Sequence, residues 1–307
     1  MLSLDYSVLN ASSYSVPQSF LHRVLALAFK QSTKQRHNLQ EIPNFLQKAV
    51  TEEWRDLQTL GTKILRILAS ELGFVVVKNL PFRNYQRPII DYFFTSLALC
   101  IGNITVHDSS NKMIWTVACR SDIQGREATF SELNTIAPFH TDSAFRHLPE
   151  KYFGLWAIKA AKDGGNSTAI NSKQVIESLA DLVSGRECLE ILRHDNFPFH
   201  VPPAFASNSH KPQIIQAPIV ADSPLIRFRL DTIMKGFKYC PELATPERLW
   251  AVKYFDRFLR GYSDKLEFKL NDGEVVFFNN HTMLHGRTAF KDRDRLLLRI
   301  RIDECKR

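Results

Sequence analysis

Cysteine is scarce in this 307-residue sequence, and its five cysteines lie far apart. Their number is odd and none forms a Cys-x-x-Cys pair, so the sequence predicts neither a disulfide framework nor a thiolate zinc site. Long apolar runs are also missing: none reaches the ~18 residues that span a membrane, and no basic segment precedes an apolar core at the N-terminus. We therefore expect a soluble protein in a reducing compartment, by default the cytoplasm.

Blocks of like charge are absent as well. The 40 basic and 32 acidic residues give a net charge of +8, but the basic residues are spread along the chain. The densest basic region, Lys291 to Arg301, alternates with acids and leucines. This pattern lacks the clustered patch or arm that is typical of nucleic-acid-binding proteins. We expect a small-molecule substrate and neither a nucleic acid nor a membrane as partner; the oligomeric state is left open.

Glycine and proline are modest in number, at 12 and 14, beside 44% hydrophobic and 23% charged residues. This composition is typical of a globular protein, and the length allows a sizeable core. No repeat, low-complexity tract or interdomain linker interrupts the chain. We predict one domain over residues 1–307, with a helical N-terminal part over 1–72 and the core over 73–307.

Apolar residues recur at helical spacing from Pro17 to about Leu72, and another helix is predicted over Arg87 to Cys100. Residues 121–138 are polar and without period, which predicts a long loop acting as a lid. A helical insert is predicted over about 240–262, with a shorter helix over Lys173 to Val183.

Short β-branched or alternating segments fill most of the remaining chain. The turn Asn271-Asp272-Gly273 lies between two of them and predicts a hairpin. The predicted strands are Gly73–Pro81, Met113–Ala118, Tyr152–Ala160, Gly164–Asn171, short strands within Pro212–Leu230, Leu266–Leu270, Glu274–Phe278 and Arg295–Ile302. Helices followed by many short strands predict an α+β, mainly β fold: a double-stranded β-helix (jelly-roll, cupin-like) core flanked by helices.

The segment PFHTDSAF carries His140 and Asp142 two residues apart. In a strand, residues i and i+2 project from the same face, so this imidazole and this carboxylate can meet at one metal ion. His285 follows the apolar segment EVVFF and offers a second imidazole. Two histidines and one carboxylate form the facial triad of non-haem iron, which leaves open positions for other ligands.

Downstream of His285, the side chains of Arg295, Leu297, Arg299 and Arg301 are expected to share one face of a strand. An arginine on the inner face of a barrel is costly unless it pairs with an anion, and its forked guanidinium fits a carboxylate. For Arg301, a solvent-exposed position is the alternative.

The ordered set HTD, GGNS, HGR and a terminal R-x-x-x-R resembles the TauD/TfdA, clavaminate-synthase-like family of oxygenases, from about Gly73 to the C-terminus. The resemblance implies Fe(II) held by His140, Asp142 and His285, with 2-oxoglutarate as co-substrate and O2 as oxidant. It also implies that Ser167 and Arg295 bind the distal carboxylate of 2-oxoglutarate. The interval from His285 to Arg295 is slightly short for the family, so Arg299 is the alternative partner of 2-oxoglutarate.

In this family, halogenases carry Gly or Ala at the carboxylate position, so Asp142 favours hydroxylation, with release of succinate and CO2. The second arginine often meets an anionic group of the substrate, which points to Arg299. Further candidate substrate contacts are Thr129 and Glu132 in the lid, Arg146, Arg229 and Asp231. An arginine facing a carboxylate and an aspartate facing an amine would suit an amino acid or a similar small carboxylic acid.

Three alternatives stay open at this point. The same chemistry could end in desaturation or cyclisation. A nucleic-acid-directed dioxygenase would account for the positive charge, although a base-flipping loop with clustered Lys and Arg is not evident in the sequence. A non-catalytic jelly-roll binding protein would keep the pocket but has no need of an intact triad.

Overall fold

A computed structural model of the chain describes residues 8–10, 55–80, 85–106, 112–120, 128–206 and 212–304. Most of the predicted N-terminal helical part, 1–54 apart from 8–10, lies outside the described residues, as do residues 121–127 of the predicted lid.

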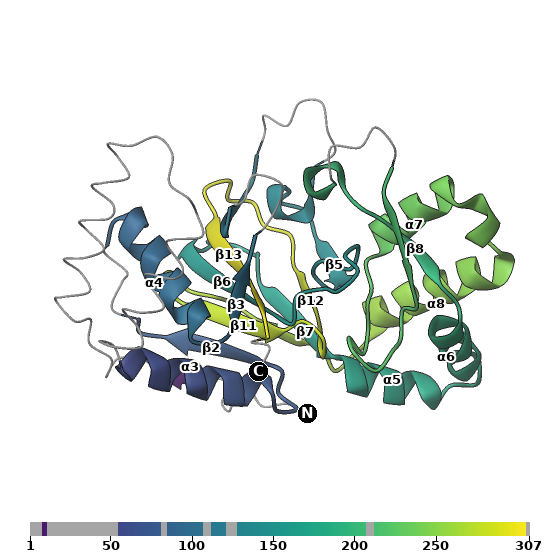
Figure 1. Cartoon of the computed structure of the whole chain (residues 1–307), viewed down its shortest axis with the longest axis horizontal. Helices are drawn as coiled ribbons and strands as arrows, with labels where there is room; N and C mark the ends of the chain where they lie inside the picture. Colours follow the sequence, from purple (N-terminus) through teal and green to yellow (C-terminus); the bar gives the residue numbers. More distant parts are fainter. Residues whose placement is uncertain are drawn as a thin grey trace.

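Two β-sheets form the centre of the molecule (Figure 1). The larger sheet has the order β1 (Val8–Asn10), β2 (Phe74–Lys78), β11 (Val275–Asn279), β6 (Tyr152–Lys159), β13 (Leu296–Asp303) and β3 (Asn103–Thr105), with β4 (Ile114–Ala118) also paired to β13. The smaller sheet has the order β10 (Leu266–Phe268), β7 (Ser167–Asn171), β12 (Met283–Arg287) and β5 (Ala137–His140). Apart from the parallel β1–β2 pair, the pairings in both sheets are antiparallel. The predicted jelly-roll core is confirmed.

The inner faces of the two sheets pack against each other. Phe74 and Val76 of β2 and Phe278 of β11 meet Ala169 and Met283 from the smaller sheet in one apolar cluster. The rings of Phe74 and Phe278 stack at 5.8 Å between centroids. This cluster fills one end of the space between the sheets and leaves the other end to polar side chains.

Helices α3 (Arg55–Leu68) and α4 (Arg87–Leu99) cover the outer face of the larger sheet (Figure 1). Strand residues alternate between the faces, so Val75 and Val77 point to these helices while Val76 points inward. Trp156 of β6 is fully buried here, with Phe93 and Phe94 of α4 each 5.5 Å away in edge-on contact. This apolar layer holds the larger sheet in place on its outer face.

A helical layer covers the outer face of the smaller sheet, to which Ile170 and Leu284 contribute their side chains. It contains α5 (Ser172–Ala180), α6 (Val183–His194), α7 (Leu230–Tyr239) and α8 (Pro246–Gly261), with the two-stranded sheet of β8 (Phe197–His200) and β9 (Ile214–Ala217). Figure 1 shows these helices grouped at one end of the molecule, opposite α3 and α4. The sheets are thus held between two helical layers.

The helical part of the chain between residues 172 and 261 is larger than predicted. The predicted insert corresponds to α8 and the preceding turn η4 (Pro241–Leu243), but α6 and α7 were missed. Within Pro212–Leu230 only β9 is a strand, and the alternation at its end leads into α7. The prediction of several short strands there was wrong, because these apolar residues pack among helices rather than on a two-faced sheet.

The predicted hairpin around Asn271-Asp272-Gly273 was also wrong. The turn forms, with Glu274 donating its backbone N–H to the Asn271 carbonyl at 3.1 Å and Gly273 at φ 84°. Its two arms, however, enter different sheets: β10 pairs with β7, and β11 pairs with β2 and β6. The turn therefore links the two layers of the jelly roll.

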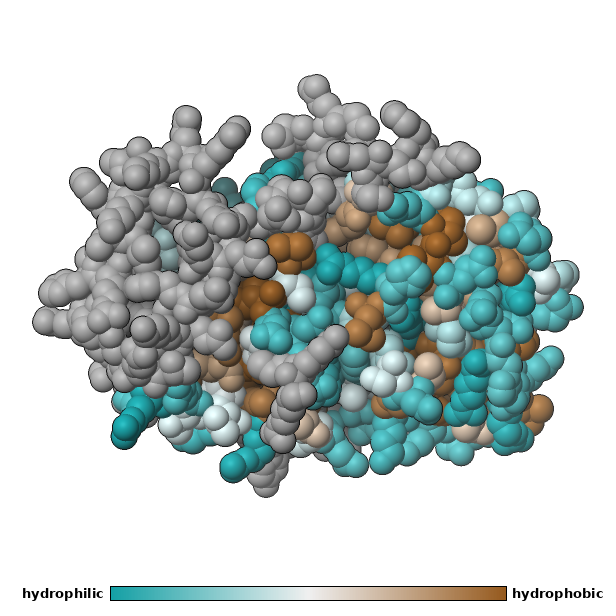
Figure 2. Space-filling view, viewed as in Figure 1, coloured by the Kyte–Doolittle hydropathy of each residue, from teal (hydrophilic) through white to brown (hydrophobic). Residues whose placement is uncertain are grey.

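No described helix is long and apolar enough to cross a membrane. Figure 2 shows one face of the molecule, where hydrophilic residues dominate the lower right of the view and hydrophobic ones gather near its middle.

The four cysteines in the described part of the chain are free thiols: Cys100, Cys119, Cys188 and Cys240.

Two glycines give a matched test of how α7 packs against β8. A methyl group on Gly236 of α7 would collide with the carbonyl oxygen of Pro198 in β8, whereas one on Gly261 would meet nothing within 4 Å. We expect Gly236→Ala to destabilise the protein by about 1–3 kcal/mol through overpacking. Gly261→Ala, at a helix end, should be neutral or stabilising by up to about 1 kcal/mol. Urea denaturation measures both, and equal midpoints would contradict the packing of α7 on β8.

Candidate active site

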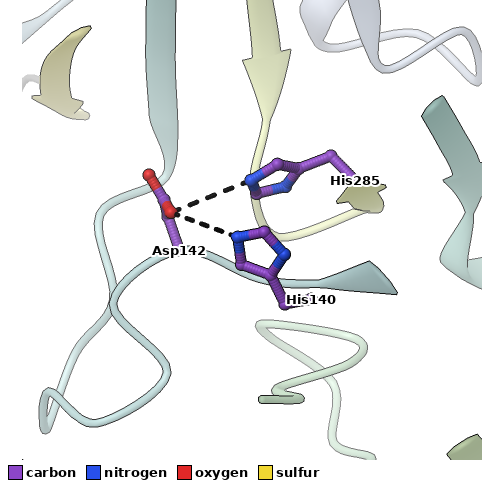
Figure 3. A group of neighbouring side chains, drawn as sticks. All are labelled: His140, Asp142 and His285. Atoms are coloured by element: carbon purple, nitrogen blue, oxygen red, sulfur yellow. Dashed lines mark ion pairs between the residues drawn. The ribbon is translucent and has the colours of Figure 1, made fainter. Parts of the chain in front are cut away.

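His140, Asp142 and His285 meet at the polar end of the space between the sheets, and all three are buried. Their candidate ligand atoms all lie within 4.8 Å of one another. Figure 3 shows both imidazoles turned toward the Asp142 carboxylate. Oδ1 of Asp142 is 3.8 Å from Nε2 of His140 and 3.7 Å from Nε2 of His285. The three predicted ligands are therefore brought together.

The register of two strands places the histidines. His285 of β12 is the direct partner of His140 at the end of β5, and their ring centroids are 4.3 Å apart. Nδ1 of His140 lies 2.8 Å from the carbonyl oxygen of Pro138, so this nitrogen carries the proton and Nε2 keeps its lone pair. One ring nitrogen of His140 is thus set to bind a metal.

Asp142 lies beyond the end of β5, so the expectation that it shares a strand with His140 was wrong. The chain leaves the sheet at Thr141, whose N–H donates to the carbonyl of Phe228 at 2.8 Å. Asn280 then holds the next residue: its Oδ1 accepts from the Asp142 N–H at 2.7 Å, and its Nδ2 donates to the Asp142 carbonyl at 3.0 Å. The buried side-chain amide of Asn280 therefore orients Asp142 in place of the backbone hydrogen bonds of a strand.

The protonation states fit a divalent metal. Burial and the nearby His285 hold the pKa of His140 well below its usual range, and burial lowers the pKa of His285. Burial also disfavours the charged form of Asp142, but Arg299, His285 and Arg301 together hold its pKa well below the usual value. Both ring nitrogens of His285 and Oδ2 of Asp142 lack hydrogen-bond partners among the described residues. Two neutral imidazoles and one carboxylate are the donor set that non-haem iron takes.

A cavity opens beside the triad, with His140 and His285 in its wall. Among the described residues that line it, five are arginines and one is acidic, Glu132. The arginines are Arg229, Arg287, Arg295, Arg299 and Arg301. Ser167, at the start of β7, also lines this cavity, so the sequence-predicted residues of GGNS, HGR and R-x-x-x-R share one space.

Arg295 is a buried cation with no carboxylate in ion-pair range among the described residues. Its guanidinium lies 5.0 Å from the ring centroid of Phe290. Burial, with Arg287 and Arg299 nearby, lowers its pKa to about 9. The backbone of Gly165 approaches its Nε, since a Cβ there would lie 3.2 Å away. An anion in the cavity would compensate this charge.

Arg299 and Arg301 both face Asp142 from β13. Nη1 of Arg299 donates to Oδ1 at 3.3 Å and is also 3.3 Å from Oδ2, while Nε of Arg301 is 3.9 Å from Oδ2. Arg301 is only 3% exposed. The solvent-exposed alternative for this residue was therefore wrong, because Arg301 lies on the face of β13 that lines the cavity.

The described part of the predicted lid contains a short 3₁₀ turn, η2 (Phe130–Glu132), and is otherwise irregular up to β5. Glu132 accepts from both N and Oγ1 of Thr129, at 3.0 and 2.9 Å, in a capping box. Arg287 of β12 donates to the carbonyls of Phe130, Leu133 and Thr135, at 3.2, 2.7 and 2.8 Å. Arg287 was not assigned to this segment from the sequence, and its three hydrogen bonds anchor the segment beside the cavity.

Of the remaining predicted substrate contacts, only Arg229 lines the cavity. Its guanidinium is 4.7 Å from the Phe130 ring, and it also donates three hydrogen bonds to Asp231, of 3.0, 3.3 and 3.1 Å. Asp231 and Arg146 are absent from the described lining, and Arg146 pairs with Glu150. His281, a further histidine near the site in sequence, is turned to the Pro149 carbonyl at 2.9 Å.

Residues 39–301 match the family described as "Taurine catabolism dioxygenase TauD, TfdA family". The chain belongs to this family. The match covers all of the helices described above, every strand of the two sheets except β1 and the last two residues of β13, the three triad residues and the five arginines of the cavity. The family resemblance drawn from the HTD, GGNS and HGR segments is confirmed.

Comparisons with individual proteins give more distant likenesses. The gamma-butyrobetaine dioxygenases of Homo sapiens and Pongo abelii are each 27% identical over 180 residues, which is 58% of this chain and 45% of theirs. The chain thus aligns with less than half of these relatives. An asparagine oxygenase solved with Fe(II), 3-hydroxyasparagine and succinate has a TM-score of 0.69 and 18% identity, covering 96% of this chain and 93% of its own. The non-heme iron oxygenase OrfP, solved with Fe and alpha-ketoglutaric acid, has a TM-score of 0.63 and 15% identity. The match covers 97% of this chain and 94% of OrfP. At these identities the two structures show a shared fold.

Asn280 offers a test of how Asp142 is positioned. Replacing Asn280 with Ala removes the amide that orients Asp142, and such outer partners typically cost about 10–100-fold in metal affinity. We expect Asn280→Ala to bind Co(II) at least about tenfold more weakly, as measured by visible absorption titration. The exposed Asn10→Ala variant is the control, with folding checked by circular dichroism. Unchanged affinity in folded Asn280→Ala would contradict the positioning role.

Proposed function

We propose that this protein is an Fe(II)- and 2-oxoglutarate-dependent oxygenase that hydroxylates an unactivated C–H bond of a small polar substrate, with release of succinate and CO2. The observation that carries the proposal is the buried group of His140, Asp142 and His285 beside a cavity rich in arginine. Membership of the TauD/TfdA family supports it. Because jelly-roll strands run from β1 to β13, we treat the chain as one oxygenase domain.

In this proposal, Nε2 of each histidine and Oδ1 of Asp142 hold the iron, since all three face one another. Bound there with 2-oxoglutarate, the metal would supply O2 activation and the oxidising power needed to attack a C–H bond. The protein's own part is to orient these ligands through Pro138 and Asn280 and to keep water out under the lid.

For the co-substrate we propose Ser167 and Arg295 as partners of the distal carboxylate. Arg295 is the buried cation whose charge no described carboxylate offsets, and a forked guanidinium with a hydroxyl nearby suits a carboxylate. Arg299 is the alternative, but it already lies 3.3 Å from the Asp142 carboxylate. That engagement favours Arg295.

Substrate contacts are proposed for Arg299, Thr129 and Glu132, which all line the cavity. Asp231 and Arg146 are given indirect roles, since Asp231 holds Arg229 against Phe130 and Arg146 pairs with Glu150. The molecules bound in the similar solved structures, 3-hydroxyasparagine and (3S)-hydroxy-L-Arg, support an amino acid or a similar carboxylic acid. The alternative outcome of the reaction is desaturation or cyclisation of the substrate. Location in the cytoplasm stays a prediction.

The proposal is tested by incubating the protein with Fe(II), 2-oxoglutarate and O2 while amino acids and small carboxylic acids are screened. We expect succinate formation to rise with a substrate that gains one oxygen atom, as detected by mass spectrometry. A product two mass units lighter than the substrate would indicate desaturation or ring closure instead. Absence of 2-oxoglutarate-dependent succinate from folded protein would contradict the proposed function.

Two arginine variants decide which residue binds 2-oxoglutarate. We expect Arg295→Gln to weaken 2-oxoglutarate binding to the Mn(II)-loaded protein by about 10–100-fold, because a charge-assisted pair is lost. Arg299→Gln should change it by less than about threefold. Calorimetric titration measures both affinities. The reverse order would transfer the role to Arg299.

A further inference from the structure

Helix α8 presents aromatic and charged side chains on the face that is turned away from the protein. Its opposite face packs into the helical layer through Ala251, Val252, Phe255 and Leu259. The outer face, which we call the α8 stripe, is formed by the exposed or partly exposed residues Glu247, Trp250, Lys253, Tyr254, Arg257 and Arg260. The rings of Trp250 and Tyr254 lie 5.3 Å apart between centroids. Because aromatic residues and arginine are enriched in protein interfaces, the α8 stripe has the composition of a binding surface.

A groove runs beside the C-terminal half of α8, at the end of the molecule remote from α3 and α4 (Figure 1). It has a volume of about 430 Å³, and its wall includes Leu182, Tyr254 and Phe258. Leu182 and the adjacent Val183, at the start of α6, are 44% and 78% exposed. Exposed apolar side chains that gather around a groove mark a site of protein contact more often than scattered ones do.

Most charges of the α8 stripe have no partner in the described part of the chain. Arg260 pairs with Asp256 at 2.7 Å, whereas Glu247, Lys253 and Arg257 form no ion pair with any described residue. The acid lies in the first turn of the helix, and both arginines lie in its last two turns. This order suits the dipole of a single helix. It also means that an antiparallel copy of α8 would bring opposite charges together.

The residues of the α8 stripe complement one another in detail. If two copies of α8 lie antiparallel about a two-fold axis between residues 253 and 254, residues at equal distances from the axis face each other. Glu247 of one copy then opposes Arg260 of the other in an ion pair. Trp250 opposes Arg257, and Tyr254 opposes Lys253, so that each ring faces a cation. A parallel pair in register would instead place like charges opposite each other, which is unfavourable.

The groove fits the same arrangement. Antiparallel pairing carries Trp250 of each copy to the C-terminal half of the other α8, where Arg257, Phe258 and Leu182 line the groove. A tryptophan that enters an apolar pocket beside an arginine is typical of the residues that dominate the energy of an interface. Because the axis is two-fold, both grooves receive a tryptophan and each contact is made twice.

We propose that the α8 stripe and the adjoining groove bind a second copy of this chain, forming an antiparallel two-fold dimer centred between Lys253 and Tyr254. The order of charges along one helix selects this occupant, since the stripe complements itself. None of the stripe residues belongs to the described lining of the cavity beside the triad. The proposal therefore goes beyond the proposed oxygenase function and stands without it.

Sedimentation velocity of the full chain tests the dimer. We expect wild-type protein to be dimeric at about 100 µM, with a dissociation constant of about 10 µM or lower. Trp250→Ala should weaken the dimer by at least about 100-fold, because an anchor residue is lost twice. Leu148→Ala is the matched control, since Leu148 is 63% exposed but lies outside helices α5 to α8. It should change the dissociation constant by less than about twofold.

A charge exchange tests the antiparallel register. Glu247→Lys alone and Arg260→Glu alone each place like charges opposite each other, and each should weaken the dimer by at least about tenfold. The double variant Glu247→Lys/Arg260→Glu restores opposite charges and should return to within about threefold of wild type. Circular dichroism confirms that every variant is folded.

Three results would overturn the proposal. The first is a wild-type protein that stays monomeric up to about 100 µM, even if the α8 stripe then binds a different protein. The second is a dimer that folded Trp250→Ala leaves intact, because its interface would lie elsewhere. The third is a double charge variant that dimerises no better than either single variant, because the two helices would then not meet in the antiparallel register.

Discussion

The buried carboxylate of Asp142 is the interaction on which the rest of the site depends. One of its oxygens faces two imidazole nitrogens at 3.7 and 3.8 Å, and the other lies beside two guanidiniums at 3.3 and 3.9 Å. Without this charge, Arg299 would be a buried cation with no described acid in ion-pair range, which is strongly destabilising. The same carboxylate therefore organises the metal side and the anion side of the cavity.

The fold serves this arrangement through register and through a few side chains outside the strands. Pairing of β5 with β12 sets the two histidines opposite each other, and Asn280 turns the chain after β5 so that Asp142 completes the group. Arg287 lies on the same strand as His285. It connects that strand to the predicted lid by donating to three of the lid's backbone carbonyls. The helical layers on both sides support the sheets, and the layer that contains α7 also contributes Arg229, at the start of α7, and Phe205 to the cavity wall.

The sequence predicted the chemistry of the site better than its scaffold. Alternation over the predicted strand Arg295–Ile302 correctly placed Arg295 and Arg299 at the cavity. The order of the short motifs likewise brought Ser167 and His285 to the same space. The local pattern at Asn271-Asp272-Gly273 predicted a turn, but pairing partners depend on which sheet each arm joins, and local pattern does not contain that information. Helix α7 was missed although its buried residues Ile233, Gly236 and Phe237 recur at helical spacing. Asn280 and Arg287 act through backbone groups distant in sequence, a role that no motif in a single sequence reveals.

The central claim is that the triad binds Fe(II) and leaves room for 2-oxoglutarate to chelate it. The most direct measurement is the visible absorption spectrum of the protein after anaerobic addition of one equivalent each of Fe(II) and 2-oxoglutarate. The account predicts a charge-transfer band that requires both additions and is lost in folded His285→Ala. A folded wild-type protein that shows no band would contradict it.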